Sequence, residues 1–132
     1  MSKDELDPID ELVVSSEVVE GENRKLLVEL LKPHVRIDPD TGSIHFINHT
    51  PDLSPKQHVL VYLMAKLALA SKKPGLSPAA KPIEVEEATR LPGGTIRPIL
   101  RKLLEERVIS QGEEGYFFEA VGLVPARAIL TE

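Results

Sequence analysis

The strongest local constraint on the fold is the segment HVRIDPDTGSIHFIN at residues 34–48. Apolar and polar residues alternate on both sides of Pro39-Asp40-Thr41-Gly42, a pattern typical of two antiparallel strands. The register that gathers the apolar side chains on one face pairs Val35 with Phe46, Arg36 with His45 and Ile37 with Ile44. A four-residue loop with proline early and glycine last favours a type I turn closed by a left-handed residue. The segment therefore predicts a β-hairpin over about residues 34–47.

Helical patterns lie on both sides of this hairpin. Before it, a stripe of leucines at positions 26, 27, 30 and 31 ends at Pro33 and predicts a helix over about residues 22–32, with Gly21 separating it from an earlier piece. After it, Ser54 and Pro55 are typical of the N-cap and first residue of a helix, predicted over residues 55–71. That helix has almost no polar face, so we expect C-terminal helices on one side and the hairpin, the first helix or a second subunit on the other.

Composition narrows the class of protein. Hydrophobic residues make up 42% of the 132 residues, but there are only three Phe, two Tyr and no Trp, which favours an aliphatic core of packed helices. The absence of Cys excludes disulfides and cysteine-ligated metals. No signal-peptide pattern opens the sequence, and no apolar run approaches the roughly 18 residues that span a bilayer. We expect an α+β, mostly α, cytoplasmic protein with no membrane contact.

The net charge of −5 averages over unlike segments. Residues 1–53 hold 5 Lys and Arg against 12 Asp and Glu, whereas residues 54–118 hold 10 against 7 and residues 119–132 hold 1 against 2. We therefore predict an acidic N-terminal extension at residues 1–53 and a second domain at residues 54–132, which ends in a helical tail from Pro125.

Residues 54–118 combine a helix, a proline-rich connector, a short helix over residues 83–90, a Pro92-Gly93-Gly94 break, a helix over residues 95–107 and a second hairpin around residues 111–115. This order resembles the winged helix-turn-helix DNA-binding family over about half of the chain. The family's pattern positions fall on Glu86, Arg90, Leu91, Thr95, Ile96, Leu100 and Leu103.

Three residues depart from that pattern. Glu86 replaces a small residue, and Arg90 replaces a glycine of left-handed conformation, so Gly93-Gly94 is expected to supply the flexibility instead. Pro98 would disrupt a helix interior. With Thr95 as N-cap, Pro98 becomes the third helical residue and its cost largely disappears, so we predict the helix start at Thr95.

The resemblance implies that helix 95–107 reads the major groove of double-stranded DNA in a small transcription regulator or accessory factor. Arg97 and Arg101, one turn apart, are the candidates for guanine contacts. The predicted DNA-binding residues are Thr95, Arg97, Arg101, Lys102, Arg90, Lys81, Lys72 and Lys73. The alternative for the helix is a solvated basic face whose Arg101 and Lys102 pair with Glu105 and Glu106.

The tip of the second hairpin weighs against DNA, because phosphate would repel Glu113 and Glu114. Winged helices also serve as protein-interaction modules without DNA binding, which is the alternative function. In either case we expect a homodimer or a protein partner, bound through residues 1–53 and helix 55–71. The acidic extension is a further candidate to cover the basic helix face, in which case deleting residues 1–22 would strengthen DNA binding.

Other site types have little support in the sequence. Four histidines occur, but the hairpin register places Arg36 rather than His34 beside His45, and no Cys completes a ligand set. The Asp38 to Gly42 loop faintly resembles a calcium loop, but it lacks the third acidic ligand, and His49 stands where the bidentate Glu would be. No nucleophile motif or phosphate loop is present, so we expect no enzyme activity, no cofactor and no metal.

Overall fold

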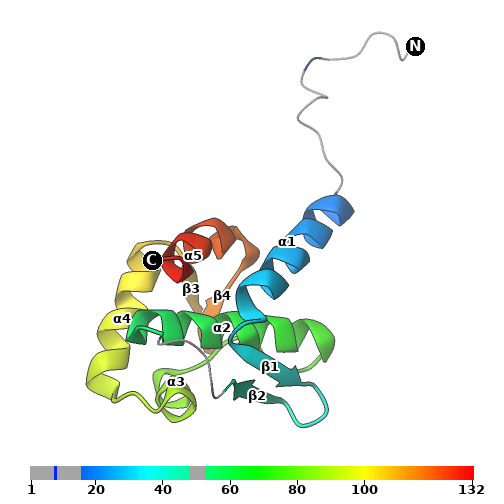
Figure 1. Cartoon of the computed structure of the whole chain (residues 1–132). Coiled ribbons are helices and arrows are strands. Elements are labelled where there is room, and N and C mark those ends of the chain that lie inside the picture. The colour runs from blue at the N-terminus through cyan, green and yellow to red at the C-terminus, as the bar shows by residue number, and fades with distance from the viewer. Residues whose placement is uncertain (1–7, 9–15, 48–52) are drawn as a thin grey trace.

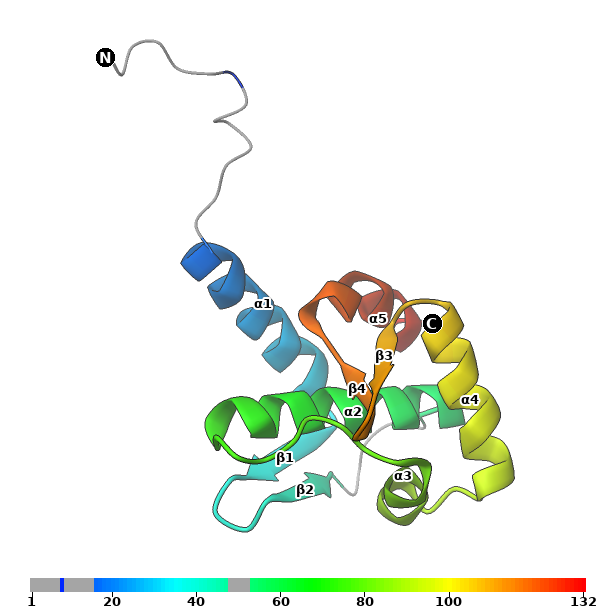
Figure 2. The ribbon, with the colours of Figure 1, turned by 180° about the vertical axis from the view of Figure 1, so that it is seen from behind.

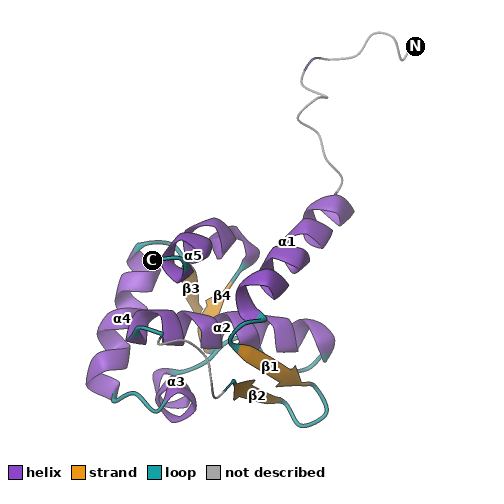
Figure 3. Ribbon diagram, in the orientation of Figure 1, coloured by secondary structure: helices purple, strands orange, loops and turns teal. Residues whose placement is uncertain are grey.

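The computed structural model describes Pro8, residues 16–47 and residues 53–132. It confirms an α+β fold that is mostly helical, with two small antiparallel hairpins (Figures 1 and 3). The elements in chain order are α1 (Ser16–Leu31), β1 (Val35–Asp38), β2 (Ser43–Phe46), α2 (Pro55–Lys72), α3 (Pro82–Thr89), α4 (Gly93–Glu105), β3 (Ile109–Gly112), β4 (Gly115–Phe118), the 3-10 turn η2 (Ala120–Gly122) and α5 (Leu123–Leu130).

The first helix is longer than the leucine stripe predicts. α1 begins at Ser16 rather than near residue 22 and runs without interruption through Gly21. A glycine inside a helix costs about 1 kcal/mol relative to alanine, which weakens a helix without ending it. The predicted separation at Gly21 is therefore wrong.

The first hairpin forms as predicted. β1 and β2 pair Val35 with Phe46, Arg36 with His45 and Ile37 with Ile44. Gly42 takes the left-handed conformation, with φ of 73°, that closes the turn. The apolar face packs against α2, so the hairpin and α1 cover one side of that helix (Figure 1).

Helix α2 is the centre of the fold. Its start is fixed by a capping box, in which the Ser54 N–H donates to Oε1 of Gln57 at 2.9 Å and the Gln57 N–H donates to Oγ of Ser54 at 3.2 Å. Its middle, from Val59 to Ala65, is buried throughout. Elements α3, α4, β4 and α5 contact the part that α1 and the hairpin leave open, which confirms the expectation that this nearly apolar helix is covered on more than one side.

The turn between α3 and α4 differs from the prediction. Arg90 itself takes the left-handed conformation, with φ of 61° and ψ of 25°, so Gly93-Gly94 does not replace the family's glycine. Both glycines instead belong to α4. A Cβ atom added at Gly93 would lie 3.0 Å from Oε2 of Glu86, so the small residue that lets these helices approach stands on α4 rather than at position 86.

Helix α4 also starts earlier than predicted. Pro92, not Thr95, is the N-cap, and its carbonyl accepts bonds from the N–H groups of Thr95 at 2.9 Å and Ile96 at 3.1 Å. Pro98 consequently lies inside the helix. The carbonyl that loses its donor belongs to Gly94, which is exposed, so water can satisfy it and the proline is tolerated.

The second hairpin is tighter than the sequence suggested. β3 and β4 pair Ile109 with Phe118 through to Gly112 with Gly115, which leaves a two-residue turn of Glu113 and Glu114 in place of a five-residue loop. Ala80 adds a third strand position, because its N–H and carbonyl exchange hydrogen bonds of 2.8 and 2.9 Å with Tyr116. The tail also begins earlier than Pro125, since α5 starts at Leu123.

Candidate nucleic-acid interface

Helix α4 is divided into a buried face and a charged face. Ile96, Leu100 and Leu103 are completely buried against the core. Arg97 and Arg101 lie four residues apart and are exposed, as is Lys102 beside them. The core therefore fixes the rotation of α4, and with it the outward direction of these three cations.

The surroundings of these cations are free of acidic residues along the chain. Residues 88–104 hold Arg90, Arg97, Arg101 and Lys102 and no Asp or Glu. Arg90 is exposed in the turn before α4, and Thr95 is half-buried in the first turn of the helix. We call Arg97, Arg101 and Lys102, together with Arg90, the α4 basic patch.

The ion pair between Lys102 and Glu106, which would neutralise part of this patch, does not form. Glu106, a candidate partner for Lys102, instead makes an ion pair with Lys56 at 2.9 Å. This bridge joins the start of α2 to the end of α4. Because Glu106 pairs with Lys56, it does not neutralise the positive charge of Lys102.

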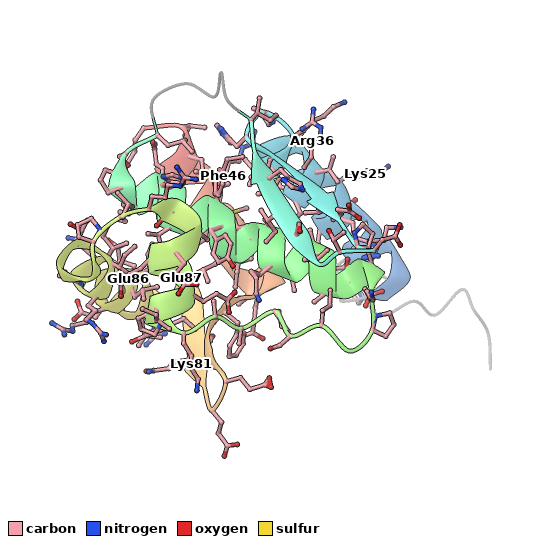
Figure 4. All side chains as sticks on the ribbon, turned by 90° about the horizontal axis from the view of Figure 1, so that it is seen from below. Lys25, Arg36, Phe46, Lys81, Glu86 and Glu87 are labelled. Atoms are coloured by element: carbon pink, nitrogen blue, oxygen red, sulfur yellow. The ribbon has the colours of Figure 1, made fainter. Side chains whose placement is uncertain are left out.

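Acidic side chains lie on α3 and around Lys81, outside the α4 basic patch. Glu86 and Glu87 lie on α3, on the same side of the molecule as Lys81 (Figure 4). Lys81 lines an open groove of about 440 Å³ with Glu84, Glu113 and Glu114. Ser77 Oγ donates to Oε1 of Glu114 at 3.0 Å, which holds one of these carboxylates at the groove. The charge of Lys81 is therefore offset locally.

The positive charge of residues 54–118 comes from α2 rather than from the helix-turn-helix segment. Residues 81–118 hold six Lys and Arg against seven Asp and Glu. The excess rests on four lysines of α2 and its end, of which Lys56 pairs with Glu106 and Lys66 pairs with Glu84 at 2.8 Å. The positive charge that favours DNA binding is thus confined to the α4 basic patch.

Lys72 and Lys73 are not brought together with that patch. They lie at the C-terminal end of α2, whereas the N-terminal end is bridged to α4 through Lys56. An α-helix rises 1.5 Å per residue, so Lys72 is about 24 Å beyond Lys56 along the axis. Figures 1 and 2 show this end of α2 on the far side of the molecule from α4.

A polar network between α2 and α3 was missed by the sequence analysis. The Tyr62 hydroxyl donates to Oε2 of Glu84 at 2.6 Å, and Lys66 Nζ lies 2.8 Å from the same oxygen. Burial, reinforced by the Glu84 hydrogen bond, raises the pKa of Tyr62 above its ordinary value of 10.0. Tyr62 and Lys66 stand four apart in the otherwise apolar stretch of α2 from Val59 to Ala70, and this spacing was the available signal. The network fixes α3, and through it the crossing with α4.

The histidines have structural surroundings. His58 meets Phe46 edge-on with ring centroids 4.5 Å apart, and burial lowers the pKa of both His58 and His34. Across residues 16–47 and 53–132, no three side chains of metal-ligating type come together. Within the same ranges, no helix has both the length and the apolar character to cross a bilayer.

Comparison of the chain with known protein families, curated proteins and solved structures finds no significant match. The charge and geometry of the chain itself are therefore the basis on which its function is inferred.

Proposed function

We propose that this protein binds double-stranded DNA by placing α4 in the major groove, as a small transcription regulator or accessory factor. The observation that carries the proposal is the α4 basic patch, whose arginines project outward because Ile96 and Leu100 are completely buried. The order α2, α3, α4, β3 and β4 supports it, since this is the order expected of a winged helix. The left-handed Arg90 supports it as well, because the family places a left-handed residue at this turn.

The charge distribution limits how the DNA is held. Glu113 and Glu114 at the wing tip, with Glu86 and Glu87 on α3, would be repelled by phosphate, so the wing stays away from the duplex. Contact then falls to the four cations of the α4 basic patch. One helix with so few phosphate contacts gives low affinity, so useful specificity requires two copies on a two-part site.

The test is a titration on mixed-sequence duplex DNA at about 50 and 200 mM salt. On mixed-sequence DNA, where the arginines contact phosphate rather than guanine, the logarithm of the binding constant falls with log salt by about 0.9 per phosphate neutralised, so four cations predict a slope of about −3.6 per protomer. Arg97→Ala with Arg101→Ala should halve the slope to about −1.8 and weaken binding. Lys72→Ala with Lys73→Ala removes the same charge at the remote end of α2 and serves as the matched control. Absent binding at low salt, or equal effects of the two pairs, contradicts the proposal.

The second candidate is a protein-interaction module. Val121 and Val124 are 81% and 77% exposed, and they lie three residues apart at the η2–α5 junction. Two highly exposed apolar side chains so close in the sequence favour a docking surface at this junction. An oligomer that Val121→Ser with Val124→Ser dissociates, in a protein without DNA affinity at low salt, would favour this function.

A further inference from the structure

An apolar groove lies between α1, β1 and α2, on a different part of the molecule from the α4 basic patch. It has a volume of about 320 Å³. Its apolar lining consists of Leu27, Val28, Leu31, Val35, Ile37 and Ala68. Val28 is 58% exposed, whereas valine is among the residues most often buried in proteins. The groove therefore offers apolar surface that the described residues leave uncovered.

The rim of this groove is cationic. Lys32 and Arg36 line it, and Lys25 is exposed on the Val28 side of α1, since residues three or four apart share a helix face. Arg36 Nη1 donates to the carbonyls of Lys32 at 2.6 Å and Val35 at 2.8 Å, which holds the guanidinium at the end of α1. Figure 4 shows Lys25 and Arg36 on the opposite side of the molecule from Glu86 and Glu87. Residues 1–53 are thus not uniformly acidic in space.

The chain contains a segment with matching chemistry. Residues 4–14, DELDPIDELVV, lie outside the described residues apart from Pro8. They hold five Asp and Glu, no Lys or Arg, and apolar residues that include Leu6, Ile9 and Val13. An apolar groove with a cationic rim is complementary to such an acidic, apolar segment, because each side removes apolar surface from water and gains opposite charges.

The length of chain is sufficient for this segment to reach the groove. Val28 lies twelve residues beyond Ser16, or about 18 Å along α1. Seven extended residues span about 23 Å, so Ile9 can return to the level of Val28. We propose that residues 4–14 bind the α1–β1 groove of their own chain, with Ile9 near Val28 and the carboxylates facing Lys25, Lys32 and Arg36. This inference is independent of the proposed DNA binding, and it gives the acidic extension a basic target other than α4.

The absence of cysteine makes the test direct. Ile9→Cys with Val28→Cys, in the full chain under mild oxidation with diamide, should form an intramolecular disulfide at least tenfold faster than Ile9→Cys with Val124→Cys. Val124 is the matched control because it is also an exposed valine, at 77% exposure, but lies on α5. Equal rates for the two pairs would overturn the proposal. Disulfide-linked dimers of the first pair would also overturn it, because they would seat the segment of a second copy in the groove.

A charge substitution separates attraction from mere proximity. Lys25→Glu with Lys32→Glu, added to the Ile9 and Val28 cysteine pair, should slow the intramolecular reaction several-fold and more strongly at low salt. Lys72→Glu with Lys73→Glu changes the net charge equally at a remote position and should leave the rate unchanged. Equal slowing by both pairs would show a general charge effect and would contradict a specific groove.

Discussion

Gly122→Ala is expected to destabilise the fold strongly, because the added Cβ would overlap a backbone carbonyl. Gly122 has φ of −84°, which any L residue can adopt, so the substitution brings no backbone strain. An added Cβ would lie 2.2 Å from the carbonyl oxygen of Val108 and 3.0 Å from Cε1 of Phe118. Carbon and oxygen atoms ordinarily stay about 3.3 Å apart or more. The turn η2 must therefore move away from the start of β3 by about 1 Å.

The nearest obstacle is a backbone carbonyl, so no change of rotamer relieves the clash. Overpacking of this kind costs about 3 kcal/mol, which for a chain of this size lowers Tm by roughly 10 °C. Thermal unfolding followed by circular dichroism measures both the mutant and a control, Gly21→Ala. Gly21 lies within α1 with nothing within 4 Å of an added Cβ, so alanine there should stabilise by about 0.5–1 kcal/mol. A Gly122→Ala protein within 1 kcal/mol of wild type would refute the packing of η2 on Val108.

Three further predictions concern single residues. In a Tyr116→Phe background, absorbance at alkaline pH should show Tyr62 ionising well above pH 10, and ionisation at pH 10 would contradict the Glu84 contact. The free energy of unfolding should fall as pH rises past 10, because the unfolded chain loses that proton first. Because burial lowers the pKa of His58, the free energy of unfolding should have its full value above pH 6.5 and decline below it. Thermal melts of His58→Gln at pH 5.5 and 7.5 should show a smaller decline than melts of the wild type. At the left-handed position 90, Arg90→Gly should be more stable than Arg90→Ala by about 1 kcal/mol in chemical unfolding, whereas a helical position would give the opposite order.

Local patterns determined several parts of the fold without tertiary information. The register of the first hairpin follows from side-chain alternation, because a slip by one residue would turn every apolar side chain to the other face. The start of α2 follows from Ser54 and Pro55, which satisfy the exposed backbone groups of the first turn. The buried stripe of Ile96, Leu100 and Leu103 follows from helical spacing alone.

Other features were decided only by contacts between distant segments. The start of α4 and the left-handed Arg90 depend on how α3 and α4 cross, with Gly93 against Glu86, and propensity had favoured the glycines for that turn. The Tyr62–Glu84 bond joins residues on two helices that no spacing rule connects. The charges show the same division. Sequence determined that residues 54–118 are basic. Only the tertiary structure separated Lys72 and Lys73 from α4 and placed Lys32 and Arg36 on a second groove. The reason is that charges interact through their distance in space rather than their position in the chain.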